Sequence, residues 1–148
     1  MTNREMIKNY NQMARVQMME AAYYTRTKEK LFRGRMRITY GIKKNMGTIL
    51  EKLKPYNEAR DELFEEFRDL EKEKKILESA APEEREAVSE SLCVIKEGKE
   101  RAEYEKRLNE LLDIDVEDVY IRGITPEDLE GIELDSAELE LLMFMIEE

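Results

Sequence analysis

Apolar residues from Ile42 to Leu77 recur at intervals of three and four positions, which is typical of a long helix packed along its length against another helix. Two series carry the pattern in steps of seven: Ile42, Ile49, Tyr56, Leu63, Leu70 and Leu77, and Met46, Leu53, Arg60, Phe67 and Lys74. The heptad keeps its phase across Pro55, although a proline inside a helix costs about 3 kcal/mol. We therefore predict either one kinked helix that ends near Ser79 or two helices that abut at Lys54.

The N-terminal residues predict a second helix that packs against the first. Thr2 and Glu5 have the spacing of a capping box, in which each side chain accepts a hydrogen bond from the other residue's backbone N–H. The following apolar residues lie on one side of a helical wheel: Met6, Ile7, Tyr10, Met13, Ala14, Ala21 and Tyr24. Residues 25–35 lose this stripe and contain Gly34, so we expect a connection or a frayed helix end there.

The middle of the chain predicts shorter elements. Pro82 is suited to the first position of a short helix, and helical spacing returns between Lys99 and Asp113. Residues 91–98 are ambiguous between a strand and a helix end, because short apolar runs do not reveal their period. The structure of residues 80–103 is therefore left open.

The C-terminal part predicts a strand followed by two helices. Ile114–Ile124 is rich in Val, Ile and Tyr and alternates locally, which predicts a β-strand with a change of phase near Asp118. Thr125 and Pro126 predict the start of a short helix. Asp135 and Glu138 cap a final helix that is apolar almost all round, so it must be buried by the domain or by a partner.

Together these elements predict a mostly α protein with a single domain over residues 1–148. Residues 1–79 form a long antiparallel, coiled-coil-like helical hairpin, and residues 80–148 form a small α/β appendage of short helices and one or two strands. A lone strand is not stable, so it needs a partner from residues 91–98 or from a second chain. A homodimer would supply that partner and would also bury the apolar final helix.

Charge is distributed unevenly along the 148 residues, although the net charge is −10. Residues 1–54 contain 13 Lys and Arg against 4 acids, and residues 55–112 contain 11 against 18. Residues 113–148 contain Arg122 alone against 13 acids. The acidic average therefore conceals a basic first part and an acidic tail, and either can form a binding surface.

The residues that usually carry catalysis are missing. The chain has no histidine, Cys93 is its single cysteine, and its six glycines lack the spacing of a nucleotide-binding loop. A calcium loop starting at Asp113 would need Gly and Glu where Asp118 and Ile124 stand. Asp113, Asp115 and Glu117 could share one face of a strand and hold Mg²⁺. The simpler interpretation is that these carboxylates form a solvent-exposed strand edge. We predict no catalytic, cofactor-binding or metal-binding residues, and no enzyme.

The N-terminal residues also lack the features of a secretory leader, and no stretch approaches about 18 uninterrupted apolar residues. We therefore expect no membrane segment and an intracellular location.

A basic patch interleaved with aromatic residues is the first candidate binding surface. It comprises Arg26, Lys28, Lys30, Arg33, Arg35, Arg37, Lys43 and Lys44. Clustered cations beside Tyr23, Tyr24, Phe32 and Tyr40 are what phosphate neutralisation and base stacking require of a nucleic-acid-binding protein. The simpler alternative is that these cations pair with the acidic tail of the same or a neighbouring chain.

An acidic patch is the second candidate surface. It comprises Asp113, Asp115, Glu117, Asp118, Glu127 and Asp128. An acidic surface can occupy a cationic nucleic-acid channel of another protein by charge complementarity.

Three stretches, Ile38–Phe67, Tyr104–Ile124 and Ser136–Glu148, cover about 64 of the 148 residues. In pattern and order they resemble a family of small uncharacterised proteins encoded by phages and prophages of Gram-positive bacteria. The resemblance implies a phage accessory protein in the host bacterial cytoplasm and supplies no catalytic residues. Residues 80–103 depart from it, because a small β-hairpin would be expected there.

The expected function is non-enzymatic. We expect a phage protein that binds a host protein effector and inhibits a host defence system, as an anti-CRISPR protein inhibits a CRISPR nuclease. The alternative is a nucleic-acid-binding or virion-assembly protein that uses the basic segment Arg26–Lys44.

Overall fold

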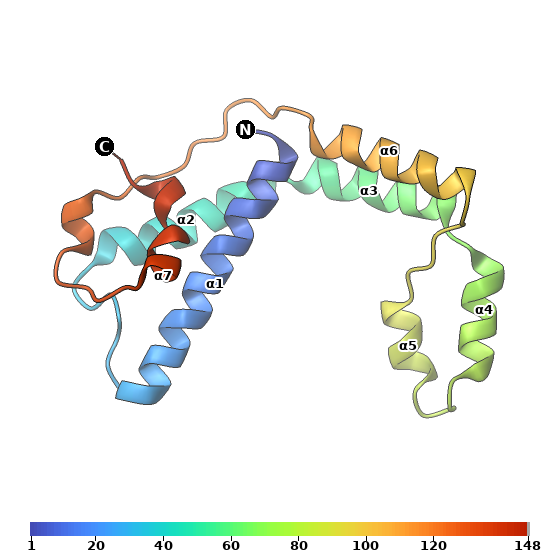
Figure 1. Cartoon of the computed structure of the whole chain (residues 1–148), viewed down its shortest axis with the longest axis horizontal. Helices are drawn as coiled ribbons and strands as arrows, with labels where there is room; N and C mark the ends of the chain where they lie inside the picture. The colour runs from blue at the N-terminus through green and yellow to red at the C-terminus, as the bar shows by residue number, and fades with distance from the viewer. Residues whose placement is uncertain (148) are drawn as a thin grey trace. The chain divides into compact units, whose positions relative to one another are not determined.

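The computed structural model describes residues 1–147 and is mostly helical, which confirms the predicted fold class at that level (Figure 1). The chain divides into two compact units. The first unit combines Met1–Lys54 with Ile114–Glu148, and the second unit is Pro55–Asp113. The subdivision expected at residue 79 lies inside the second unit.

The first unit is built on two helices, α1 (Asn3–Thr27) and α2 (Met36–Lys52), which contact each other and diverge toward the residues 28–35 that join them (Figure 1). Three short helices follow in the C-terminal segment: η1 (Pro126–Leu129), α7 (Ser136–Glu140) and η2 (Met143–Met145). The fully buried apolar side chains of this unit come from both parts of the chain: Met6, Met13, Val16, Ile38, Ile42, Ile49, Ile124, Leu142 and Met145.

The predicted capping boxes are confirmed. Thr2 with Glu5 and Asp135 with Glu138 satisfy the first backbone N–H groups of α1 and α7. A third box, Thr125 with Asp128, starts η1. Helix α1 extends to Thr27, three residues beyond Tyr24, where the predicted apolar stripe and the expected helix end.

The prediction of one continuous long helix is wrong. Helix α2 ends at Lys52 and α3 (Lys54–Phe67) begins two residues later, which agrees with the alternative of two helices abutting at Lys54. A further break at residues 68–69 was not predicted, and α4 (Leu70–Ser79) begins after it. The predicted second arm is therefore three helices, and the coiled-coil-like hairpin is not confirmed.

Burial follows the heptad only as far as the second break. Ile42 and Ile49 are buried in the first unit, and Tyr56 and Leu63 are buried in the second. Leu70, the next position of the same series, is 63% exposed. The pattern therefore describes α2 and α3 but not α4.

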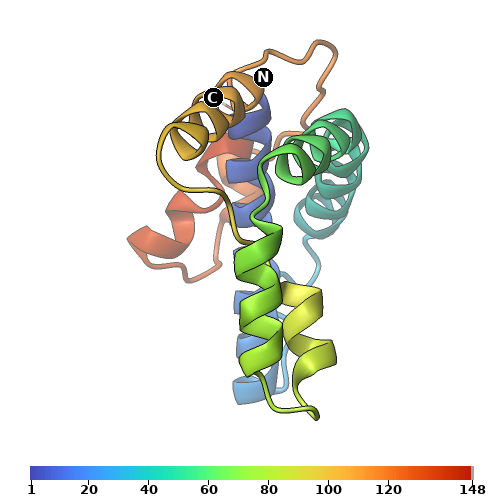
Figure 2. The same cartoon turned by 90° about the vertical axis from the view of Figure 1, so that its right-hand side faces the viewer.

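The second unit consists of α3, α4, α5 (Arg85–Ser91) and α6 (Lys99–Leu112). Helices α3 and α6 are linked by an ion pair between Arg107 and Glu66 at 2.8 Å and by the rings of Phe67 and Tyr104, whose centroids are 6.0 Å apart. Helices α4 and α5 lie side by side in both views (Figures 1 and 2). The ambiguous residues 91–98 make a single β-bridge, between Ile95 and Arg68.

An ion pair between Arg68 and Glu73 holds the break between α3 and α4. The guanidinium donates from Nε and from Nη2 to the two oxygens of Glu73, both at 2.8 Å. Glu73 is 3% exposed and is the buried residue of α4. Its carboxylate raises the pKa of Arg68. Asp69 starts α4 by accepting a hydrogen bond from the Lys72 backbone N–H at 3.1 Å.

Ile114–Ile124 does not form the predicted strand. Within the described chain it makes two isolated bridges, one from Asp115 to Thr2 and one from Ile124 to Ile146. Asp118, where a change of phase was expected, has a positive φ of 57°. The α/β appendage is therefore not confirmed, because this segment forms isolated bridges and no ladder of paired strands.

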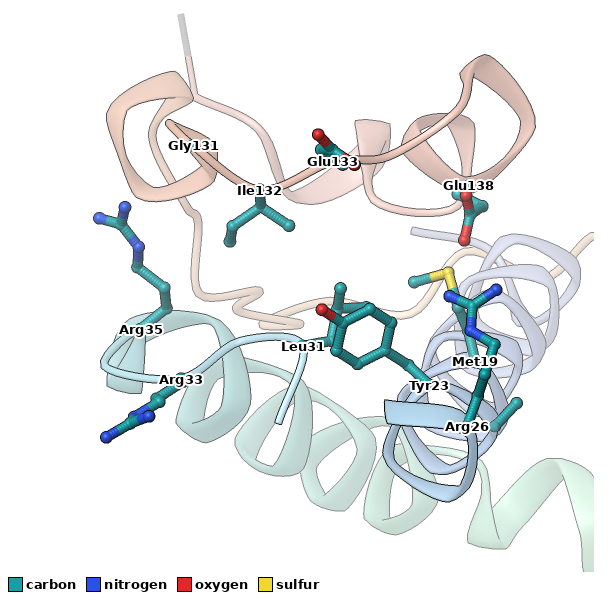
Figure 3. Close-up of a pocket in the computed structure, with 11 residues that line it drawn as sticks. Met19, Tyr23, Arg26, Leu31, Arg33, Arg35, Gly131, Ile132, Glu133 and Glu138 are labelled. Atoms are coloured by element: carbon teal, nitrogen blue, oxygen red, sulfur yellow. The ribbon is translucent and has the colours of Figure 1, made fainter. Parts of the chain in front are cut away.

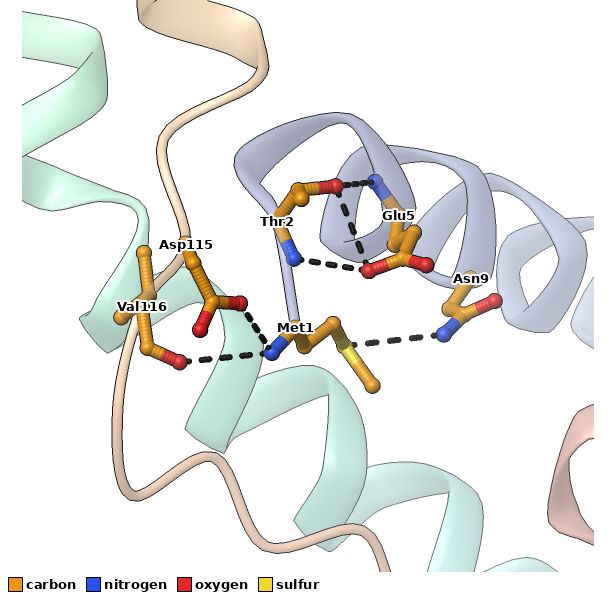
Figure 4. A network of polar contacts seen from close by, with 6 residues as sticks. All are labelled: Met1, Thr2, Glu5, Asn9, Asp115 and Val116. Carbon is orange, nitrogen blue, oxygen red and sulfur yellow. Dashed lines mark hydrogen bonds and ion pairs between the residues drawn. The ribbon is translucent and has the colours of Figure 1, made fainter.

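The N-terminus is bound to the start of this segment. The terminal ammonium donates to the Asp115 carboxylate at 2.8 Å and lies 3.4 Å from the Val116 carbonyl oxygen (Figure 4). Leu142 and Met145 from the apolar C-terminal residues are buried within the same chain. Met143 is 55% exposed, so the chain covers these apolar residues only in part. The unpaired strand, the first reason for expecting a homodimer, does not form.

Asn45 joins α2 to the C-terminal segment. Its side-chain amide donates to the Arg122 carbonyl at 3.0 Å and accepts from the Arg122 N–H at 2.7 Å, as a neighbouring strand would. Asn45 is 1% exposed. Arg122 is followed by Gly123, where a Cβ would overlap the Glu147 side chain, so a larger residue there would require this exposed side chain to move.

No helix within residues 1–147 combines the length and the apolar character needed to cross a membrane.

Replacing Asn45 by alanine should lower the free energy of unfolding by about 1–3 kcal/mol, because both Arg122 backbone groups lose their partner. Amide hydrogen exchange at Arg122 should become faster. Asn11, which is exposed on α1, provides the control, since Asn11→Ala brings the same gain in helix propensity without a lost contact. Equal stability of the two variants would contradict the assigned role of Asn45.

Candidate functional site

The structure gathers the predicted basic patch around the connection between α1 and α2. Arg26 lies in the last turn of α1, and Lys28 follows it at the C-cap. Lys30, Arg33 and Arg35 belong to the connection itself, and the other three cations lie on α2: Arg37, Lys43 and Lys44. All eight cations therefore belong to the first unit.

The connection has a defined conformation. Lys28 and Gly34 adopt positive φ angles of 61° and 74°, which end α1 and turn the chain toward α2. The Lys28 N–H donates to the Tyr24 carbonyl at 2.7 Å, and the Arg35 N–H donates to the Phe32 carbonyl at 2.9 Å. Phe32 is 4% exposed, so its ring anchors the middle of the connection in the core.

Part of the patch is compensated within the chain, as the simpler sequence interpretation expected. Arg37 pairs with Asp128 of η1 at 3.7 Å, and Arg35 donates to the Glu130 backbone carbonyl. The Arg26 guanidinium lies over the Tyr23 ring, 5.6 Å from its centroid. Arg35 and Arg37 therefore connect the basic segment to the acidic tail.

Asp128 is the centre of this connection. Its carboxylate accepts from the Thr125 N–H at 2.8 Å and from the Thr125 hydroxyl at 3.1 Å. The Thr125 backbone hydrogen bond, helped by the charges of Arg37 and Arg35, lowers the pKa of Asp128 below its ordinary value of 3.8.

A mixed-charge pocket of about 600 Å³ lies between α1, the connection and residues 131–138 (Figure 3). Figure 3 shows Arg26 and Glu138 pointing toward one another across it. The lining residues combine both signs of charge with apolar groups: Met19, Ala22, Tyr23, Arg26, Leu31, Arg33, Arg35, Gly131, Ile132, Glu133 and Glu138. Because Arg26 points toward Glu138 and Glu133 also lines the pocket, this pocket is poorly suited to an anionic partner.

A larger cavity of about 1010 Å³, here called the basic hollow, lies between α1, α2 and the connection. Its lining residues are Gln17, Glu20, Ala21, Tyr24, Lys28, Glu29, Lys30, Leu31, Phe32, Arg33, Gly34, Met36, Thr39, Ile42 and Lys43. Its four cations, Lys28, Lys30, Arg33 and Lys43, form no ion pair with any carboxylate of residues 1–147. Tyr24 is 51% exposed and Met36 is 74% exposed, so apolar surface lies beside these charges.

Glu20 introduces a carboxylate into the basic hollow. Burial raises the pKa of Glu20, and the charge of Lys43 acts in the opposite direction. Sequence reasoning missed both Glu20 and Met36 as parts of this surface. Met36 could have been found from its position, since it lies between Arg35 and Arg37 and outside the heptad that buries Ile42 and Ile49.

The predicted acidic patch is not brought together as one free surface. Asp113 belongs to the second unit, and the other five residues belong to the first. Asp115 is held by the terminal ammonium and Asp128 by Thr125 and Arg37, as described above. Within the described residues, no three carboxylates or cysteines are grouped so that they could hold a metal ion.

No family model, curated protein or solved structure matches the chain. The functional interpretation therefore depends on the geometry and charge of these surfaces and on the resemblance described above.

Replacing Asp128 by asparagine should change how stability depends on pH. A carboxylate whose folded pKa is lowered stabilises the fold above its unfolded pKa of about 4, and this contribution is lost as the pH falls through the lowered value. The melting temperature of the wild type should therefore exceed that of the variant by a constant amount above about pH 5, and the difference should shrink below about pH 4. A difference that is the same at every pH would contradict the assignment.

Proposed function

We propose that this chain is a non-enzymatic interaction protein that binds an acidic partner through the basic hollow. The observation that carries the proposal is that Lys28, Lys30, Arg33 and Lys43 surround exposed apolar surface and form no ion pair with any carboxylate within residues 1–147. Glu20, on which the charge of Lys43 acts, is the carboxylate of the hollow nearest to this role. Cations placed around an apolar surface complement a partner that offers carboxylates around apolar side chains.

The resemblance to phage and prophage proteins gives the proposal its setting. We take the partner to be a host protein in the bacterial cytoplasm and the effect to be inhibition of a host defence system, of the anti-CRISPR kind. The basic hollow supports this role better than the acidic patch does, because Asp115 and Asp128 already have partners in the chain. Of the acidic patch, Glu117, Asp118 and Glu127 are the exposed residues of the first unit for which no such partner is described.

The proposal predicts binding of an acidic polypeptide despite the chain's net charge of −10. Labelled poly-L-glutamate should bind the full chain at low ionic strength, as measured by fluorescence polarisation, and the binding should weaken with salt. The triple variant Lys28→Glu, Lys30→Glu, Arg33→Glu should lose it. A matched variant, Lys74→Glu, Lys75→Glu, Lys99→Glu, has the same net charge and should keep it.

Loss of binding in both triple variants would show that net charge alone decides, and would contradict the assignment of the hollow. Circular dichroism should give the same helix content for both variants, since all six residues lie outside the buried core.

Nucleic-acid binding is the second candidate, and the half-exposed rings of Tyr24 and Tyr40 near the free cations favour it. We expect a labelled single-stranded oligonucleotide to bind no more tightly than poly-L-glutamate of equal charge, measured by the same method. Tighter oligonucleotide binding that Lys28→Gln, Lys30→Gln and Arg33→Gln abolish would favour this candidate instead. Arg35 and Arg37 stay unchanged in the test, because they hold the tail.

A further inference from the structure

The basic hollow is flanked by two helical stripes. Gln17, Ala21 and Tyr24 follow one another on α1 at intervals of four and three, and Lys28 continues the stripe at the C-cap. From α2, the stripe Met36, Thr39 and Lys43 has intervals of three and four. Eleven residues of α1 at 1.5 Å each make the hollow about 16 Å long, which is the length of about three helical turns.

The surface between these stripes is apolar. Ala21 and Leu31 expose apolar surface there, and Phe32 and Ile42, which are 4% and 1% exposed, lie beneath it as part of the core. Tyr24 and Met36 stand exposed above this apolar lining. Methionine adapts its unbranched side chain to different apolar groups, and exposed methionines are common where a protein binds apolar helix faces.

We infer that the basic hollow binds an amphipathic, acidic α-helix of the partner protein. The helix would place apolar side chains at i, i+3 or i+4, and i+7 on the lining, and its flanking Glu and Asp would meet Lys28, Lys30, Arg33 and Lys43. The inference rests on the proposed function and adds the kind of segment that the partner presents.

Charge and ring geometry favour such a helix over a nucleic-acid strand. Glu20 and Glu29 line the hollow beside the four cations, so its charge is mixed. A helix can place its few carboxylates opposite the cations and away from these two acids, whereas a phosphate backbone carries a charge at every nucleotide. The Tyr40 ring is covered on one face by Arg122, whose guanidinium carbon is 5.2 Å from the ring centroid, and is less available for stacking.

The test compares two labelled peptides of the same composition with the full chain. One, of about 14 residues, places Leu at helical spacing with Glu and Ala elsewhere, and the other scrambles these residues so that no apolar face forms. The amphipathic peptide should bind about tenfold more tightly than the scrambled one, because only it covers the apolar lining. The Lys28→Glu, Lys30→Glu, Arg33→Glu variant should lose both.

A second variant separates the apolar contribution from the charge. Met36→Ser should bring the amphipathic peptide close to the affinity of the scrambled one and leave poly-L-glutamate binding unchanged. Met18→Ser is the matched control, since Met18 is 72% exposed on α1 and does not line the hollow.

Equal affinities for the two peptides would overturn the inference, and so would an oligonucleotide that displaces the amphipathic peptide at equal charge concentration. If poly-L-glutamate binds at the hollow but the amphipathic peptide gains nothing, the inference fails and the proposed function stands. If neither ligand binds, both fail.

Discussion

The contact between Asn45 and Arg122 is the constraint on which the first unit depends. An amide side chain is needed there, because it must donate to a carbonyl and accept from an N–H of the same residue. From this point the acidic segment continues along α2, where Ile124 pairs with Ile146 and Met145 packs close to Gly41. Without the contact, two polar backbone groups would lose their partner at a site where little water reaches, and the tail would lose its best-defined attachment to the helices.

This attachment also decides which cations remain available. By holding residues 122–130 near the start of α2, it brings Asp128 and the Glu130 carbonyl within reach of Arg37 and Arg35. These two arginines are therefore used to bind the tail, whereas the cations that line the basic hollow form no ion pair with a carboxylate of the described chain. The chain can therefore have an acidic isoelectric point and still carry a basic hollow, because its positive and negative charges are separated in space and are only partly paired.

Local signals in the sequence predicted the structure better than long-range ones did. Capping boxes involve residues three positions apart, so Thr2 with Glu5 and Asp135 with Glu138 could be identified from sequence alone. The heptad could not distinguish one helix from successive helices, because the spacing of apolar residues is the same in both cases. The break between α3 and α4 is instead held by the ion pair between Arg68 and Glu73, which the spacing does not reveal. The strand prediction failed for a related reason, since β propensity in Ile114–Ile124 describes side chains, whereas a ladder needs a partner along its whole length. The residues of the basic patch could be named from the sequence. Which of them bind the tail and which line the basic hollow could not, because this depends on contacts between residues about 90 positions apart, such as Arg37 and Asp128. No local pattern reveals such contacts.

The basic hollow is suited to recognition because its walls are already formed. Two helices carry most of its side chains, and the connection between them is fixed by the turn at Gly34 and by the buried ring of Phe32. A partner therefore does not need to order these backbone segments when it binds, so less of the interaction free energy is lost to conformational entropy. The lysines on the rim do lose side-chain entropy on pairing, at about 0.5–1.5 kcal/mol each, and their charge contacts are screened by salt. The charges should thus contribute mainly to the rate and the choice of partner, and the apolar lining beside Met36 should contribute most of the affinity.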